Sequence, residues 1–114
     1  MNMTAEQKEL LLKWVAALRS GKYPQTRLKL KDHEGYCCLG VLCDVVNPEG
    51  WLSHDSRGFD FSYQESVALP STFIQTLLPK FVYANIAEFV RMNDFEGKSF
   101  VEIANYIESL YETN

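Results

Sequence analysis

The sequence lacks any long hydrophobic run, since its uninterrupted apolar stretches are far shorter than the ~20 residues that a membrane helix needs. Its first turns carry Glu6, Glu9 and Lys13, where an export signal would be apolar. We therefore expect a cytoplasmic protein that makes no contact with a membrane.

The signatures of common enzymes are also absent. The sequence contains no glycine-rich phosphate loop, no serine-centred elbow and no HExxH run. Cysteine is scarce: Cys37 and Cys38 are adjacent, and Cys43 is the third. Neighbouring cysteines bridge only with strain, so we expect reduced thiols, as in a cytoplasm.

A metal site is the first chemistry to weigh, because His33 and the three cysteines lie close together in the sequence. If residues 38–46 are helical, Cys38 and Cys43 point about 140° apart around the axis and cannot converge on one ion. We expect no metal and no cofactor, and thiols that pack as small hydrophobic side chains. A small enzyme that uses Asp44, His33 or a cysteine remains an alternative.

Positive charge is scarce in the second part of the chain. The net charge is −4, with seven Lys/Arg against four Asp/Glu in residues 1–43 and four against eleven in residues 44–114. Binding to DNA requires a clustered positive excess, so we expect no DNA partner. The acidic C-terminal part offers a surface for another protein.

Two capping boxes mark helix starts, Thr4 with Gln7 and Ser99 with Glu102. Gly21 is expected to end the first helix. Apolar residues at helical spacing give each helix an inner face, namely Leu11, Trp14, Val15 and Leu18 on the first and Phe100, Ile103, Ala104 and Ile107 on the last.

The segment from Cys38 to Val46 is apolar except at Gly40 and Asp44. A helix that is hydrophobic almost all round is normally buried, so we predict a central helix over 38–46. Gly40 and Asp44 share a face, where another backbone can approach beside a single carboxylate.

The other segments suggest strands and short helices. Together they predict an α+β fold, a single domain over residues 1–114 in which helices pack on a small antiparallel sheet or hairpins. The expected elements are a hairpin over 26–37, a loop over 51–58, a strand over 59–63 with a partner at 67–69, a short helix over 70–79, and a helix over 83–92 that stops at Asn93 and Asp94.

The predicted strand of the hairpin would place Arg27, Lys29 and Lys31 on one side. With Tyr23 and Tyr36 nearby, these cations could hold a phosphate-bearing ligand and stack its base. Lysines on an edge strand also serve to block aggregation, so both interpretations remain open.

Three stretches of the sequence resemble a family of small proteins found in phages and prophages: GYCCLGVLCD (35–44), RSGKYPQTR (19–27) and MNDFEGKSFVEIANYIE (92–108). The resemblance runs from the first helix to the last, and segment 47–80 is its most variable part. It implies an accessory protein made in the cytoplasm of an infected bacterium, and it implies no particular chemistry. The matching polar positions are candidates for a site, or for hydrogen bonds that join the hairpin, the central helix and the final turn: Gln25, Arg27, Asp44, Asn93 and Asp94.

Our hypothesis from the sequence is a non-catalytic binding protein that sequesters a host factor. The factor is either a small anionic, nucleotide-like defence signal or a host protein bound through the acidic surface. A homo-oligomer and a purely structural role also remain open. The residues expected to bind a ligand are Tyr23, Gln25, Arg27, Lys29, Tyr36, Asp44, Asn93 and Asp94.

Overall fold

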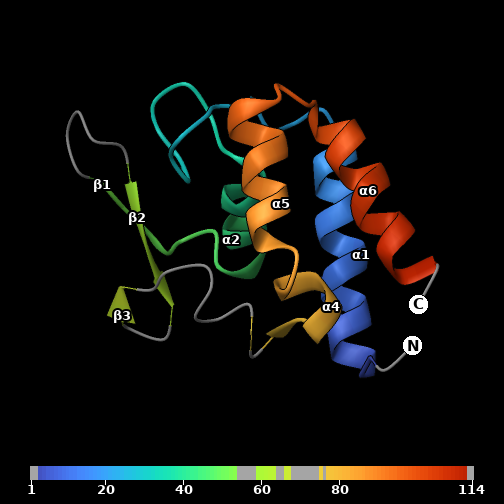
Figure 1. The fold of residues 1–114 in the computed structure, drawn as a ribbon. Helices are drawn as coiled ribbons and strands as arrows, with labels where there is room; N and C mark the ends of the chain where they lie inside the picture. Colours follow the sequence, from blue (N-terminus) through green and yellow to red (C-terminus); the bar gives the residue numbers. More distant parts are fainter. Residues whose placement is uncertain (1–2, 54–58, 64–65, 68–74, 76, 113–114) are drawn as a thin grey trace.

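A computed structural model of the 114-residue chain describes residues 3–53, 59–63, 66–67, 75 and 77–112 (Figure 1). Among these residues, no helix has the length and apolar character needed to cross a membrane. The elements in chain order are α1 (Ala5–Arg19), α2 (Cys38–Val46), β1 (Trp51–Ser53), β2 (Phe59–Tyr63), β3 (Ser66–Val67), α4 (Lys80–Tyr83), α5 (Ile86–Val90), the π-helix η2 (Arg91–Phe95) and α6 (Phe100–Glu112).

Both predicted capping boxes are present. The Gln7 amide donates to the Thr4 hydroxyl at 3.1 Å, and the Glu102 amide donates to the Ser99 hydroxyl at 3.2 Å. The apolar residues predicted for the inner faces of the two helices are all buried. Gly21 follows the end of α1 with a φ of +75°, a conformation that glycine adopts without strain.

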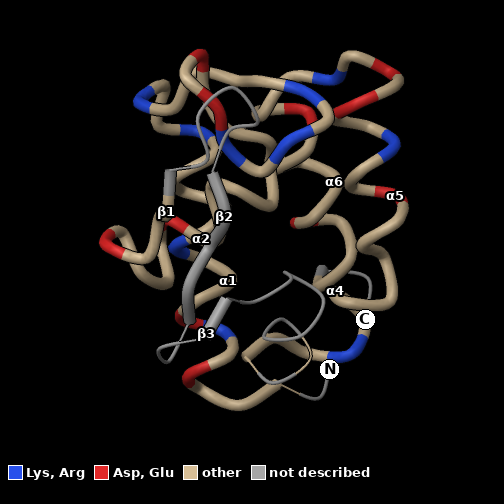
Figure 2. Tube along the Cα trace, turned by 90° about the vertical axis from the view of Figure 1, so that its left-hand side faces the viewer, with Lys and Arg blue, Asp and Glu red and all other residues tan. Residues whose placement is uncertain are grey.

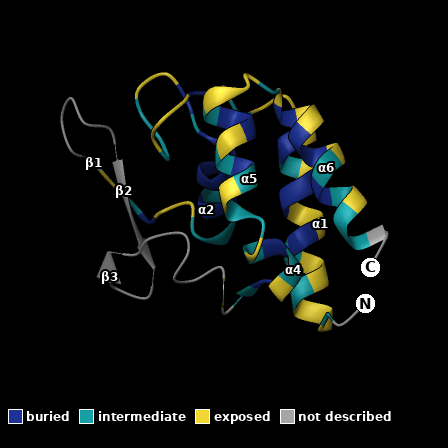
Figure 3. Ribbon diagram, viewed as in Figure 1, coloured by how far each residue is buried: buried dark blue, intermediate teal, exposed yellow. Residues whose placement is uncertain are grey.

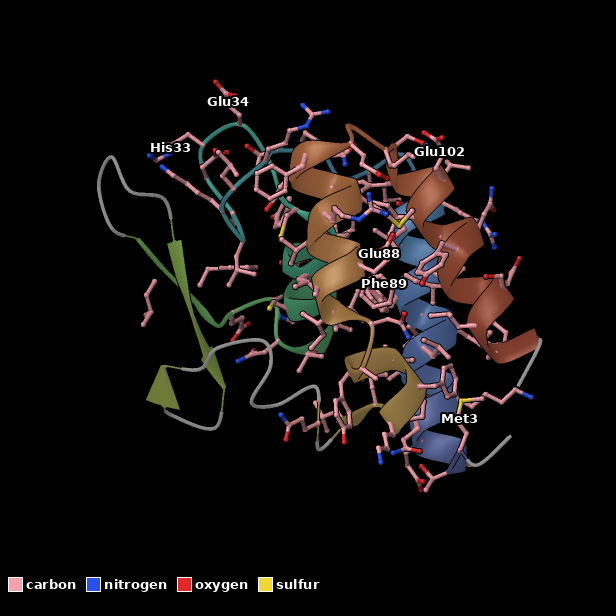
Figure 4. All side chains as sticks on the ribbon, in the orientation of Figure 1. Met3, His33, Glu34, Glu88, Phe89 and Glu102 are labelled. Carbon is pink, nitrogen blue, oxygen red and sulfur yellow. The ribbon has the colours of Figure 1, made fainter. Side chains whose placement is uncertain are left out.

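The core forms where helices pack on one another. Trp14 of α1 is fully buried, its indole N–H donates to the carbonyl of Cys38 at 2.9 Å, and its ring meets Phe89 edge-on at 5.5 Å. Phe89 in turn contacts Tyr106 of α6, with ring centroids 5.9 Å apart. Phe89 therefore lies at the meeting point of α1, α5 and α6, whose inner faces are buried (Figures 3 and 4).

The predicted fold class, helices packed on a small antiparallel sheet, is wrong, because the structure is mostly helical. Three short strands pair antiparallel in the order β1-β2-β3, but they lie to one side of the helices (Figure 1). The inner faces of α1 and α6 can pack on each other and on α2, which is apolar nearly all round. No sheet is therefore needed to bury them.

The hairpin predicted over 26–37 is also wrong. This stretch belongs to the α1–α2 loop (residues 20–37), in which Tyr36 forms only isolated bridges with Gln25 and Lys31. Leu28 has a φ of +69°, which no strand residue adopts. Arg27, Lys29 and Lys31 therefore do not form a cationic strand face.

The central helix α2 has the predicted bounds and is buried through Cys43. Its Gly40 also meets another backbone, as predicted, and the partner is Leu30 of the α1–α2 loop. A Cβ at position 40 would lie 1.8 Å from the Leu30 carbonyl oxygen, which accepts the Cys37 amide at 3.0 Å. The missing side chain of Gly40 thus lets the loop lie directly on α2.

The C-terminal part differs from the prediction mainly in its helix ends. The helix expected over 83–92 begins at Ile86 and continues through η2 to Phe95, so Asn93 and Asp94 do not stop it. Gly97, with a φ of +67°, follows its end.

The middle of the chain is described in part. Residues 51–53 form β1 rather than a loop, β2 has the predicted bounds, and its partner β3 begins one residue earlier than expected. Residues 54–58 and 68–69, and most of the helix predicted over 70–79, lie outside the described residues.

We predict that Gly40→Ala lowers the free energy of unfolding by about 3 kcal/mol or more, because the new methyl group would push the Leu30 carbonyl away from Cys37. Gly21→Ala is the matched control: nothing lies within 4 Å of its Cβ position, and only the positive φ opposes the change, at about 1 kcal/mol. Urea denaturation of the two variants measures the difference. Equal losses would contradict the contact.

Candidate functional site

A fully buried amide, that of Asn93, joins three segments of the chain. Its Oδ1 accepts from Gln25 Nε2 at 2.8 Å and from the backbone amide of Cys38 at 3.3 Å. Cys38 is the first residue of α2. Its Nδ2 donates to the Thr26 carbonyl at 2.9 Å and to Asp94 Oδ1 at 2.8 Å. One side chain therefore fixes the α1–α2 loop to both α2 and η2.

Gln25 and Asp94 extend this junction. Gln25 Nε2 also donates to the Lys98 carbonyl at 2.8 Å, and Asp94 Oδ1 accepts the backbone amide of Leu28 at 3.0 Å. Three of the eight predicted site residues are thus brought together with Asn93 at the centre. Their polar atoms bind one another and the backbone, which fits the structural alternative proposed for these positions.

The same junction presents two large apolar side chains to solvent. Leu28 is 69% exposed and Phe95, the last residue of η2, is 73% exposed. Arg27 is also exposed, and its guanidinium lies beside Gly97. Among the described residues, no carboxylate pairs with this guanidinium. We call Arg27, Leu28 and Phe95 the tip surface.

The backbone of the tip surface is strained. Leu28 is the one non-glycine with positive φ in the described part of the chain, and for such a residue this conformation costs about 1–2 kcal/mol. The Asp94 carboxylate holds it there by accepting the Leu28 amide. Strained residues and π-helical turns concentrate at functional sites, and here both occur together.

A second group of predicted residues gathers at Asp44 of α2. Asp44 Oδ2 accepts from the Tyr23 hydroxyl at 2.6 Å, and its Oδ1 accepts from the Trp51 indole at 3.0 Å. The Tyr36 ring meets Tyr23 edge-on at 5.0 Å and Trp51 at 5.9 Å. We call Tyr23, Tyr36 and Trp51 the aromatic cluster.

A lysine ammonium caps the aromatic cluster. Lys31 Nζ lies 5.0 Å from the centroid of Tyr36 and 5.1 Å from that of Trp51. Burial, together with the hydrogen bond to Asp44, raises the pKa of Tyr23 well above its ordinary value, so the phenol stays protonated and donates. Two of these rings contact a cation, and a carboxylate lies beside the aromatic cluster, so the environment disfavours the phosphate proposed from the sequence.

The predicted site residues are therefore divided between two places. Gln25, Asn93 and Asp94 form the junction under the tip surface, which holds Arg27. Tyr23, Tyr36 and Asp44 lie together at the aromatic cluster, where the Lys31 ammonium lies over the Tyr36 ring. Lys29 belongs to neither group and lies near Asp32, whose pKa it helps to lower after the Thr26 hydroxyl and the backbone amides of the turn. Leu28, Phe95 and Trp51 were not predicted as site residues from the sequence. Gly97, as a helix-end signal, is the one feature of the sequence that indicates a helix continuing to Phe95.

The three cysteines are buried, as expected, and unpaired with one another. Burial raises the pKa of Cys37 to about 11 and raises the pKa values of Cys38 and Cys43 as well. His33 points outward from the α1–α2 loop, away from these thiols (Figure 4). Within the described ranges, no group of three His, Cys, Asp or Glu side chains is placed to hold a metal ion.

The acidic surface expected from the second part of the chain is partly neutralised by ion pairs where the structure describes it. Basic and acidic residues are interspersed along the trace (Figure 2). Four acidic residues in the C-terminal part form ion pairs: Glu88 and Glu96 with the same arginine, Arg91, Glu102 with Lys98, and Glu108 with Arg19.

A pocket of about 380 Å³ opens between the start of α1 and the end of α2. It includes none of the eight predicted site residues. Its lining combines apolar and charged side chains: Glu6, Glu9, Leu10, Lys13, Val45, Val46 and Leu77.

Residues 3–111 match a family model described as a domain of unknown function, DUF8296. The chain belongs to this family. No curated protein and no solved structure matches it. The DUF8296 match covers the described helices except for the last residue of α6, together with the tip surface and the aromatic cluster, so both sites lie within the family's own domain.

We predict that the thiols of this DUF8296 protein are unreactive while it is folded, because burial keeps them protonated. Near pH 8, native alkylation by iodoacetamide should be more than about 100-fold slower than that of free cysteine. All three cysteines should react in guanidinium chloride, which serves as the control. Rapid native labelling of one cysteine, located by peptide mass spectrometry, would revive the enzyme alternative.

We predict that Asn93→Ala costs about 3 kcal/mol of unfolding free energy, because it leaves the Thr26 carbonyl and the Cys38 amide buried without their partner. Asn105→Ala on α6 removes only an exposed hydrogen bond, which the Asn105 amide oxygen accepts from Arg19, and should cost about 1 kcal/mol or less. Thermal and urea denaturation compare the pair. Similar stabilities would show that the junction does not depend on Asn93.

Proposed function

We propose that this DUF8296 protein is a non-catalytic phage or prophage accessory protein that sequesters a factor of the bacterial host, and that the factor is a host protein bound at the tip surface. One observation carries the proposal. Two large apolar side chains, Leu28 and Phe95, are exposed to solvent on the surface that also carries Arg27, whose guanidinium pairs with no carboxylate of the described residues.

The composition of the tip surface suits a protein partner. Aromatic residues and arginine are enriched at protein interfaces and often contribute most of the binding energy. Burying an exposed phenylalanine is worth about 1.5–3 kcal/mol. The hydrogen bond from Leu28 to Asp94 fixes the backbone in advance, so little ordering is required on binding.

The competing hypotheses have less support. A nucleotide-like ligand was expected to use a cationic strand face that does not form. Of the two rings meant to stack its base, Tyr36 lies under the Lys31 ammonium and Tyr23 donates to Asp44 instead. The acidic residues meant to contact a host protein are mostly ion-paired where they are described. An enzyme that uses a cysteine would need a thiolate, which burial disfavours.

The viral setting rests on the sequence motifs. The stretch from Gly35 to Asp44 and the stretch around Asn93 resemble those of phage and prophage proteins. In the structure these two stretches meet, since the Cys38 amide donates to Asn93. Within the proposal, the shared motifs build the support of the tip surface, while the exposed side chains on it choose the partner.

We predict that Leu28→Gly and Phe95→Ala each reduce recovery of the host partner more than about tenfold, while Leu12→Ala does not. Leu12, 45% exposed on α1, is the matched control for loss of an exposed apolar side chain. The measurement is affinity capture of the tagged protein from bacterial cells, followed by quantitative mass spectrometry and a Kd with the purified partner.

Leu28→Gly separates binding from folding. Glycine adopts positive φ freely, so the free energy of unfolding of this variant should lie within about 1 kcal/mol of that of the parent. Loss of the partner with stability retained therefore assigns the effect to the tip surface. Equal recovery of the host partner with Leu28→Gly, Phe95→Ala and Leu12→Ala would refute the proposal, as would capture of a nucleotide rather than a protein.

A further inference from the structure

The contact between Lys31 and the aromatic cluster has a geometry that proteins also use for ligands. An ammonium within about 6 Å of a ring centroid is attracted to the electron-rich face, and sets of such rings recognise quaternary ammonium ligands and methylated lysines. In this protein Lys31 Nζ satisfies the distance for two rings at once, Tyr36 and Trp51. The rings are steeply inclined, with an interplanar angle of 67°.

The carboxylate of Asp44 completes the arrangement. It accepts from Tyr23 and from Trp51, so it fixes two members of the aromatic cluster and adds a negative charge beside the rings. Tyr23 contacts Tyr36 edge-on, which fixes the third ring. With Lys31 set aside, what remains is three positioned rings and one carboxylate, all only partly buried. Aromatic ring faces and a carboxylate both attract a positively charged ligand.

We propose that the aromatic cluster and Asp44 form a binding site for an organic ammonium group, which Lys31 occupies in the free protein and which a ligand enters by displacing the Lys31 side chain. The ligand class is a methylated ammonium, either a free quaternary amine or a methylated lysine of a peptide. The site shares no residue with the tip surface, so it stands or falls independently of the proposed function.

The surrounding backbone allows Lys31 to leave without unfolding. On one side, the Leu30 carbonyl accepts the Cys37 amide; on the other, the Asp32 amide donates to the Gly35 carbonyl at 2.9 Å. Both neighbours of Lys31 are therefore fixed, so its flexible, partly exposed side chain can rotate away from the rings while the backbone stays in place. Rotamer changes of this kind occur within nanoseconds when a side chain is exposed.

A methylated ammonium should compete well for this site. The lysine ammonium is compact and strongly hydrated, so leaving the rings costs it little. A methylated ammonium presents apolar surface to the same rings and keeps its positive charge. An anionic ligand would face Asp44, which argues against a phosphate group here.

Fluorescence of Trp51 provides the test. The chain has two tryptophans, and Trp14 is fully buried, so a ligand-dependent change reports on Trp51. We would titrate choline and a trimethyl-lysine peptide into the full-length protein and into Lys31→Ala. Both proteins should bind these ligands. Lys31→Ala should bind them roughly tenfold more tightly, because the Lys31 ammonium no longer competes for the rings. The tighter of the two ligands identifies the source of the ammonium group.

Two controls isolate the charge and the rings. The neutral carbon analogue of choline has the same shape without the charge and should bind at least roughly tenfold more weakly than choline to the unaltered protein. Asp44→Asn should also weaken choline binding, with folding checked by circular dichroism. No saturable response in folded Lys31→Ala, equal affinity of the two proteins, or equal binding of choline and its analogue would each overturn the proposal.

Discussion

The structure around both sites depends on one buried amide, that of Asn93. A neutral side chain that offers a donor and an acceptor at one position can satisfy both the Thr26 carbonyl and the Cys38 amide. An aspartate would turn a second acceptor toward the Thr26 carbonyl, and an apolar residue would satisfy neither group. Because buried backbone groups are costly to leave unpaired, the conformation of the α1–α2 loop follows from this single residue.

The α1–α2 loop supplies residues to both surfaces, and its attachments divide it between them. The junction at Asn93 and Asp94 sets the position of residues 27 and 28, which belong to the tip surface. The contact of Leu30 with Gly40 then redirects the chain along α2 and places Lys31 over the rings. A loop without regular secondary structure thus gains the rigidity that recognition requires from side-chain and backbone hydrogen bonds.

Local signals in the sequence predicted α1, α2 and α6 well, because capping and amphipathic spacing act within a few residues. Thr4, Ser99 and the apolar run of α2 are examples. The fold class and the hairpin were wrong for the opposite reason. Alternation of Arg27, Lys29 and Lys31 is typical of a strand, but the backbone there is set by Asn93, more than sixty positions away. Nothing nearby in the sequence reports that bond.

The candidate sites illustrate the same limit in chemical terms. Three cations that are grouped together in the sequence lie in three different environments. Arg27 lies beside Gly97 and pairs with no carboxylate of the described residues, Lys29 lies near Asp32, and Lys31 lies over two rings. The ligand each place prefers follows from the groups that stay fixed around it rather than from the charge in the sequence. At the tip surface those groups are a guanidinium and two apolar side chains, which suit an acidic group set in an apolar surface. At the aromatic cluster they are rings and a carboxylate, which suit a cation, so the residue that suggested phosphate binding from the sequence instead marks where a positive group fits.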